Sequence, residues 1–245
     1  MFPLLNVMVR SIPWFLSVAV FIQRVLVRKI PMTLSGIAAS YHLHSLPRLA
    51  SQFLYEQYHP HVVDTTSIPF AEFPVASSCR TRVFPSAVAT FFAPSDPCGI
   101  NGMHHERIHA TSLWHNEYPR YDCVYVTTGS KSGMEGMHVA RVRLFFSFVH
   151  QQTTFPCAFV EWFTLSDDCP DPETGMWVVE PEVDDNGEIV SSVIHIDTIL
   201  RSAHLIPVFG DVTLSSGFHF SDSLDAFSAY YVNRYADHHS FEIVF

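Results

Sequence analysis

The sequence YDCVYV at residues 121–126 begins a series of short apolar runs, rich in Val, Phe and Trp, that decides the fold. The later runs are VARV (139–142), FVEWF (159–163), GMWVV (175–179) and IHID (194–197). Gly, Pro and acidic residues separate them, and short apolar runs between turn signals are typical of β-strands. Their nearly regular spacing predicts a small antiparallel barrel or sandwich between residues 121 and 210. This stretch contains no catalytic signature.

The segments before this series have different patterns. The sequence LPRLASQFLYEQY at 46–58 repeats its apolar residues at helical spacing and has a proline suited to a first turn, so it predicts a helix. Residues 61–78 are polar and contain prolines, which indicates an irregular connection. Residues 81–92 predict β-structure with a break at Pro85. We expect a short helix or an ordered connection over residues 102–114.

A C-terminal helix is predicted for residues 221–235, where Ser221 or Asp222 can cap the first turn. Its buried face would consist of apolar residues at intervals of three and four, namely Leu224, Phe227, Tyr231 and Tyr235. The chain is therefore predicted to be an α+β protein, in which a helical and irregular N-terminal segment precedes a small antiparallel β-barrel-like module and a packing helix. The expected divisions are an apolar leader (1–45), a helix with a connecting segment (46–120), the β-barrel-like module (121–210) and the C-terminal helix packed on it (211–245).

The charge of the chain limits its partners. The 245 residues carry a formal net charge of -10 at pH 7, and no Lys or Arg stands between Leu144 and Leu200. Nucleic-acid affinity comes largely from clustered Lys and Arg, so direct binding of nucleic acid is not expected. The acidic residues of this stretch are interpreted as solvated turns. The alternative is that they attract a basic partner such as a histone tail.

Neither the cysteines nor the histidines form an established metal pattern. The 5 cysteines are widely spaced without a C-x-x-C pair, which predicts reduced, mostly buried thiols. Two histidine groups are candidates for metal binding: His104, His105 and His109 on one helical face, and Asp237-His238-His239. Neither has an H-E-x-x-H arrangement, so surface or hydrogen-bonded histidines are the favoured interpretation, and no metal or cofactor is predicted.

The leader contains an apolar run from Ile12 to Ile22, preceded by Arg10 and followed by Arg24. The run is shorter than the ~20 residues that a membrane-spanning helix needs, so a membrane span is not expected. A secretory signal can contain an apolar region this short. A secreted or membrane-associated protein therefore stays the alternative to a soluble one.

Several motifs occur in a fixed order between residues 46 and 245: SAVATFFAPSD (86–96), GMHHERI (102–108), YDCVYV (121–126), SVIHID (192–197), AHLIPVFG (203–210), SLDAF (223–227) and YADHH (235–239). They resemble the C-terminal region of proteins encoded by Plavaka-type DNA transposons of basidiomycete fungi. The resemblance implies an accessory region without the transposase region of full-length members, located in the nucleus. A chromatin protein or a transposase subunit is the implied partner. No catalytic or binding residue is carried over, and the oligomeric state stays open.

A second similarity concerns the fold alone. The order of DCVYV (122–126), VARV (139–142), VEWF (160–163) and GMWVV (175–179) is similar to the strand plan of bromo-adjacent homology (BAH) domains, which are chromatin-associated β modules. One fold supports many functions, so this likeness implies an architecture and no activity.

One candidate binding surface consists of aromatic residues. Tyr125, Trp162 and Trp177, if they converge at one end of the barrel beside Asp167 and Asp168, would hold a cationic side chain against their ring faces. The alternative is that the three rings belong to the core.

One candidate catalytic group consists of carboxylates. Asp122, Glu161 and Asp197 stand on or beside predicted strands, and they would serve a metal-dependent nuclease if they converged to hold two Mg²⁺ ions. Nothing in their spacing indicates convergence. The leading hypothesis is therefore a non-catalytic accessory or interaction region with no catalytic residue, and a metal-dependent nuclease or transposase fragment is the alternative.

Overall fold

The structure is a computed structural model that describes residues 19–22, 33–62, 65, 68–96, 99–129, 131–210, 213–214 and 216–245. Within these residues the α-helices are α1 (Leu34–Tyr41), α2 (Leu46–Tyr58) and α3 (His238–Ile243). Short 3-10 turns are η1 (Phe70–Glu72), η2 (Gly133–Gly136), η3 (Ile196–Thr198) and η4 (Phe220–Asp222).

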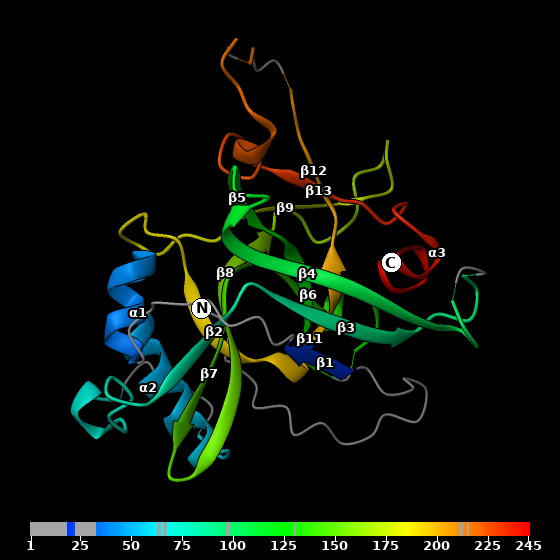
Figure 1. Cartoon of the computed structure of the whole chain (residues 1–245). Helices are drawn as coiled ribbons and strands as arrows, with labels where there is room; N and C mark the ends of the chain where they lie inside the picture. The colour runs from blue at the N-terminus through cyan, green and yellow to red at the C-terminus, as the bar shows by residue number, and fades with distance from the viewer. Residues whose placement is uncertain are drawn as a thin grey trace.

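The strands dominate the molecule, and every pair of neighbours is antiparallel. They are β1 (Ala19–Ile22), β2 (Thr81–Phe84), β3 (Ser86–Phe92), β4 (Met103–Trp114), β5 (Tyr118–Tyr121), β6 (Cys123–Thr127), β7 (Met137–His150), β8 (Thr153–Leu165), β9 (Trp177–Pro181), β10 (Ser191–His195), β11 (Ile199–Ala203), β12 (Leu205–Pro207) and β13 (Tyr230–Val232). The smaller sheet has the order β1-β3-β4-β5. The larger has the order β11-β6-β7-β8-β9-β13-β12, with β10 paired to β8 and β2 to β7. The sheets curve around each other into a nearly closed barrel (Figure 1).

The long hairpin of β7 and β8 lies at the centre of the larger sheet. Its turn residues Gln151 and Gln152 both have positive φ, 46° and 67°, as in the two-residue turns that match strand twist. The pairing register shifts between Val142 and Leu144, which is a β-bulge. An extra residue at a bulge exchanges the two faces of a strand. Consequently Val142 and Phe145 face the same core, whereas Leu144 faces another.

Three apolar cores surround this hairpin. The central core lies between the two sheets and includes Ile108, Val124, Val142, Phe145 and Trp162. The helical core joins α1 and α2 to the hairpin and includes Leu34, Phe53, Leu144, Phe146 and Phe159. The C-terminal core joins the larger sheet, through strands that include β13, to α3 and includes Tyr125, Val139, Phe163, Tyr230 and Ile243. Strands β7 and β8 contribute to all three.

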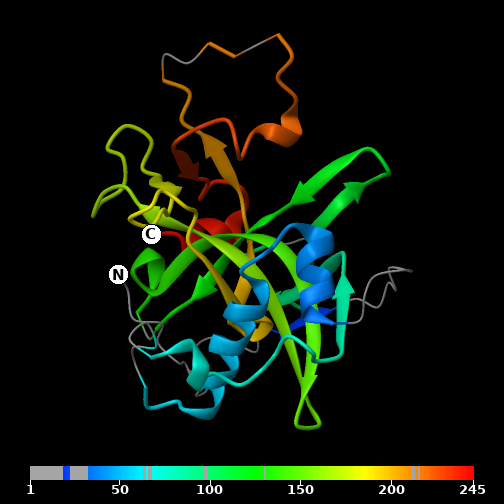
Figure 2. The same cartoon turned by 90° about the vertical axis from the view of Figure 1, so that its left-hand side faces the viewer.

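Helices α1 and α2 lie on one side of the barrel, and α3 lies on the opposite side (Figures 1 and 2). The side-chain oxygen of Thr33 accepts the Gly36 N–H at 3.3 Å and so caps α1. That helix ends at His42, which has left-handed backbone geometry. In α2, Leu49 and Phe53 lie one turn apart and are buried in the helical core.

The α+β class and the antiparallel barrel-like architecture predicted from the sequence are confirmed. The predicted helix over residues 46–58 is α2 with the same bounds. Residues 81–92 form β2 and β3 on either side of Pro85, as the break at that proline indicated. The strand series from residue 121 onward is present as β6 to β10, and a helix lies close to the C-terminus.

Two helix predictions were wrong in position. Residues 102–114 form strand β4, because Met103 to His109 pair along the whole of β3 and the strand then continues beside β5. Residues 221–235 are not a helix. Tyr230–Val232 pairs with both β9 and β12, and this pairing requires extended backbone. The C-terminal helix is α3, which begins after the capping residue Asp237.

The C-terminal end of the expected leader (residues 1–45) is part of the fold. Leu34 and Ile37 of α1 are buried in the helical core together with α2. Most of the apolar run from Ile12 to Ile22 lies outside the described residues, except for β1, which pairs with β3. No helix in the described part of the chain is long and apolar enough to cross a membrane.

Candidate functional site

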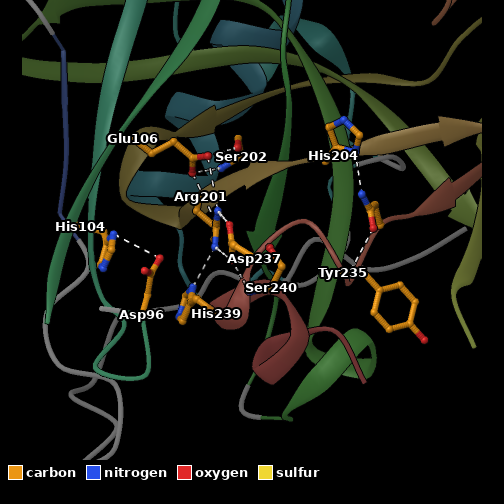
Figure 3. Close-up of polar contacts among 11 residues, drawn as sticks. Asp96, His104, Glu106, Arg201, Ser202, His204, Tyr235, Asp237, His239 and Ser240 are labelled. Atoms are coloured by element: carbon orange, nitrogen blue, oxygen red, sulfur yellow. Dashed lines mark hydrogen bonds and ion pairs between the residues drawn. The ribbon is translucent and has the colours of Figure 1, made fainter. Parts of the chain in front are cut away.

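Arg201 on β11 is the centre of the most connected polar cluster in the described structure (Figure 3). Its Nη1 donates to Asp237 Oδ1 at 2.9 Å, and its Nη2 donates to Asp237 Oδ2 at 2.6 Å. Glu106 on β4 lies on the other side, 3.4 Å from the Arg201 Nε, and also accepts the Ser202 N–H at 3.1 Å. The cluster therefore joins the smaller sheet, the larger sheet and the start of α3.

Aromatic rings enclose this cluster. The guanidinium carbon of Arg201 lies 4.6 Å from the Phe91 ring centre, and His239 stacks on the same ring at 4.7 Å. His239 Nδ1 accepts from Arg201 Nη1 at 3.2 Å, so this nitrogen carries no proton. Burial, followed by the charge of Arg201, lowers the pKa of His239 and favours its neutral form. With Arg201 only 4% exposed, the arrangement is a structural connection rather than an open site.

The carboxylate of Asp237 has two roles at this junction. Its Oδ1 accepts the Ser240 N–H at 2.7 Å and caps α3, in addition to binding Arg201. Burial would raise the pKa of Asp237, but the hydrogen bonds from Arg201 and Ser240 outweigh it and lower the pKa to about 2. Asp237 is therefore ionised at neutral pH. Its charge holds α3 against the sheet.

An open cleft of about 320 Å³ lies beside strand β5. This volume is at the lower end of the range of ~300–1,000 Å³ that small-molecule sites occupy. We call it the β5 cleft. It is lined by Trp114 of β4, by Tyr118, Pro119, Arg120, Tyr121 and Asp122, by Arg141 of β7, and by Phe220, Ser221, Ser223 and Leu224. The last four belong to residues 220–225, which we call the η4 segment.

Arg120 forms one side of the β5 cleft, and its side chain is 41% exposed. Its guanidinium carbon lies 4.8 Å from the Trp114 ring centre, a cation–π arrangement. Its Nε donates to Asp122 Oδ1 at 2.8 Å, and Nη2 makes a longer contact with Oδ2 at 3.4 Å. Asp122 also accepts the backbone N–H of His109 at 2.8 Å. These contacts fix the orientation of the guanidinium.

Arg141 lies deeper in the same cleft and is 8% exposed on its side chain. Its Nη1 and Nη2 both donate to Asp225, the second at 3.1 Å, so its outer edge is occupied. Tyr121 lies beside it, and Arg143 stacks on the Tyr121 ring at 4.6 Å while it pairs with Glu161 at 3.0 Å. The charge of Arg141 is neutralised, and its contact with Asp225 holds the η4 segment over the sheet.

Two aromatic rings, those of Phe220 and Tyr118, also line the β5 cleft. Phe220 is 60% exposed and meets Tyr118 edge to face, with ring centres 4.7 Å apart. His219 lies against both rings, at 4.1 Å from Phe220 and 5.6 Å from Tyr118. An exposed Phe next to a partly exposed Tyr at the mouth of a cleft is typical of binding surfaces.

The aromatic surface expected from the sequence does not form. Tyr125 is 0% exposed and lies with Trp177 in the C-terminal core, whereas Trp162 lies in the central core on the other face of the sheet. The pairing explains the separation: Tyr125 is opposite Val139, and Trp162 is opposite Ala140, the next residue along β7. Asp167 and Asp168 are exposed in the β8–β9 connection. The structure thus places all three rings in cores.

The three carboxylates proposed for metal-dependent cleavage are also apart. Asp122 is engaged by Arg120 and His109, and Glu161 is engaged by Arg143. Asp197 lies in η3 beside His195, 3.3 Å from its Nδ1, and its side chain is 61% exposed. Within the described residues, no group of three or more His, Cys, Asp or Glu side chains is placed to hold a metal ion.

The histidine groups have structural contacts. His104, His105 and His109 stand on a strand instead of a helix, so neighbouring residues point to opposite faces. His104 faces Asp96 at 3.7 Å, His105 bonds to Thr90 at 2.9 Å, and His109 bonds to Asp122. In the other group, Asp237 and His239 both bind Arg201.

The thiols follow the sequence prediction in part. Cys123 and Cys157 are buried and free, Cys79 is half-buried and free, and Cys169 is free and exposed. Burial raises the pKa of the Cys123 thiol to about 12 and that of Cys157 well above its ordinary value. Cys98 lies outside the described residues.

Sequence reasoning missed the β5 cleft because its walls come from distant parts of the chain. Trp114 and Arg120 belong to a hairpin whose first strand was predicted as a helix or connection, and Phe220 was placed just before a predicted helix. One signal was present. Trp114, Tyr118 and Arg120 fall within a few residues of Asn116, a turn-forming residue that has positive φ here.

Comparisons with known protein families, curated proteins and solved structures give no match.

Proposed function

We propose that this protein is a non-catalytic interaction module that binds a peptide segment of a protein partner in the β5 cleft. One observation carries the proposal: a cleft of ligand size combines partly exposed aromatic rings with an arginine whose guanidinium is held in place. Trp, Tyr and Arg are the residues that most often dominate binding energy at protein interfaces. Phe220 and Arg120 both line this cleft.

The position of the cleft supports a peptide ligand. It runs alongside β5, which is at the end of the smaller sheet, and β4 is the one strand with which β5 pairs among the described residues. Pro119 within β5 has no backbone N–H, so continuous strand pairing along this edge is interrupted. Recognition would depend on side chains in the cleft more than on added backbone pairing.

We also propose that the chain derives from the C-terminal region of Plavaka-type transposon proteins and acts in the nucleus, with a chromatin protein or transposase subunit as the partner. The ordered motifs from residue 86 to residue 239 support this origin. Sequencing the genomic neighbourhood tests it, because an adjoining in-frame transposase region is expected for a fragment. Exclusive secretion of the tagged full chain would contradict the nuclear location.

The binding proposal is tested by selecting peptides from a random phage-displayed library against the full chain and measuring the selected synthetic peptides by calorimetry. Phe220→Ala should weaken binding about tenfold or more, as expected for an aromatic residue that dominates an interface. Phe241→Ala is the matched control, since Phe241 is 51% exposed on α3, outside the cleft. The proposal fails if no peptide binds saturably, or if both substitutions have the same effect.

A further inference from the structure

We infer that the β5 cleft recognises a carboxylate next to a flat apolar group, with Arg120 as the residue that binds the carboxylate. This inference rests on the proposed function, because it names the ligand chemistry of the same cleft. The ligand class is an acidic side chain or a chain-terminal carboxylate of a peptide, adjacent to an aromatic or aliphatic residue.

Arg120 has one guanidinium edge that Asp122 does not use. A guanidinium has five N–H donors arranged in a planar fork. Asp122 takes the edge formed by Nε and Nη2, at 2.8 and 3.4 Å. Among the described residues, Nη1 of Arg120 makes no hydrogen bond. The edge formed by Nη1 and Nη2 is therefore open to a second carboxylate, and two parallel N–H···O bonds match its geometry.

The two arginines of the cleft differ in what occupies the edge formed by their terminal nitrogens. Arg141 presents the same kind of edge, but Asp225 already occupies it, with both of its terminal nitrogens engaged. Asp225 thus shows within this protein how a carboxylate seats on a cleft arginine. Arg120 lines the same cleft and has the equivalent edge without a carboxylate on it from any described residue, and its side chain is 41% exposed.

The Arg120 side chain is held in place by its neighbours. Trp114 supports one face of the guanidinium at 4.8 Å, and Asp122 fixes its inner edge. His109 in turn holds Asp122 through its backbone N–H at 2.8 Å. A long side chain that is already ordered loses less conformational entropy when it binds a ligand. The Arg120 guanidinium is therefore already oriented to bind a carboxylate at its Nη1–Nη2 edge.

The charges of the cleft and of the whole chain limit the rest of the ligand. Arg141 is paired with Asp225 and Arg120 with Asp122, so the cleft carries little net charge and gives no advantage to a segment with many charges. The whole chain has a formal net charge of -10, which works against a highly acidic partner at long range. A single carboxylate beside an apolar group satisfies both conditions. Phe220 and Tyr118, which also line the cleft, then supply the apolar surface.

The experiment uses three small probes on the full chain: N-acetyl-phenylalanine, its uncharged amide, and phenyl phosphate. Chemical shifts of the Trp114 indole and of cleft amides are followed by NMR at millimolar probe concentrations. The carboxylate probe should bind at least about tenfold more tightly than the amide, because a charge-assisted hydrogen-bond pair is lost with the charge. Raising the salt concentration should reduce this preference, since the site is partly exposed.

Variants separate the role of Arg120 from that of the cleft. Arg120→Gln should abolish the preference for the carboxylate, and Arg120→Lys should keep only part of it, because a lysine retains the charge but loses the planar fork. Arg82→Gln, an exposed arginine on β2, is the matched control. Phe220→Ala should weaken the carboxylate and amide probes to a similar extent. Thermal unfolding of each variant checks that the fold is intact.

Different outcomes overturn different claims. Equal binding of the carboxylate and the amide in the cleft would refute the carboxylate inference and leave the peptide-binding function standing. A preference that survives Arg120→Gln would also refute it. Tighter binding of phenyl phosphate than of the carboxylate would replace the ligand class with phosphate. If none of the probes shifts a cleft resonance, while library peptides still bind and depend on Phe220, the carboxylate inference alone falls.

Discussion

Substitution of Asp237 by asparagine isolates the charge that attaches α3 to the barrel. Asparagine keeps a side-chain oxygen that can accept the Ser240 N–H and cap the helix, but it removes the negative charge opposite Arg201. The other contacts of Arg201, to Glu106 and Phe91, are retained. The loss of stability in Asp237→Asn therefore measures the contribution of the ion pair. The loss in Asp237→Ala measures the contributions of the ion pair and the helix cap together.

The expected magnitude follows from the pKa of Asp237. Its pKa is lowered from 3.8 to about 2. That difference corresponds to about 2.4 kcal/mol at 1.36 kcal/mol per pH unit. The side chain is 30% exposed, and solvent screening reduces the contribution to about 1–2 kcal/mol. A chain of this size loses about 2–4 °C of Tm per kcal/mol, so Asp237→Asn should lower the Tm by about 2–8 °C at neutral pH.

The pH dependence has a definite sign. A carboxylate with a lowered folded-state pKa stabilises the protein fully above its unfolded-state pKa, here 3.8, and loses that contribution as the pH falls towards about 2. About half of the stabilisation should be gone near pH 3. Urea unfolding of wild type and Asp237→Asn at a series of pH values measures the difference, with the exposed Asp185→Asn as the control. Equal stability at pH 7, or a difference that does not shrink in acid, would refute this reasoning.

Three further predictions concern the turn, a buried indole and the thiols. Replacing Gln152, which has a φ of 67°, by glycine should stabilise the β7–β8 hairpin by about 0.5–1 kcal/mol, seen as a higher urea midpoint with an unchanged m-value. Ser192→Ala should cost about 1–2 kcal/mol, because the Trp162 indole N–H then loses its acceptor at 2.9 Å; if Ser192→Thr is equally destabilised, the hydrogen bond is not the cause. Of the described cysteines, Cys169 should be alkylated rapidly in the native protein, while Cys123 and Cys157 should stay protected until unfolding, as peptide mapping by mass spectrometry would report.

The sequence was sufficient for elements whose pattern is local. The helix over residues 46–58 has a long apolar face and a proline in its first turn, and its bounds came out as predicted. The β7–β8 hairpin has two long apolar runs joined by a short polar turn. These elements are specified by their own periodicity and turn residues. Their type and bounds can therefore be predicted without knowing which other elements they contact.

Elements that depend on distant partners were not predictable in the same way. Strand β4 has a polar sequence with no clear alternation, and its pairing with β3 makes it a strand. Helix α3 is too short for periodicity to reveal it. Its position depends on the Asp237 cap and on Arg201, which is far away in the sequence.

The candidate site needed the same long-range information. Tyr125 and Trp162 look equivalent in the sequence, but the strand register places them on opposite faces of the sheet. A shift of register by one residue would exchange those faces. In the β5 cleft, Arg120, Arg141 and Phe220 come from three separate parts of the chain.

The bulge between Val142 and Leu144 has a consequence for how the protein unfolds. The bulge directs side chains of β7 into different cores along the strand. Unfolding of one core therefore disrupts β7 and, through β7, the other cores. The chain should then open as one cooperative unit despite its helical and C-terminal additions. Amide hydrogens of Ala140 and Phe146, on either side of the bulge, should exchange at the same slow rate, limited by global unfolding.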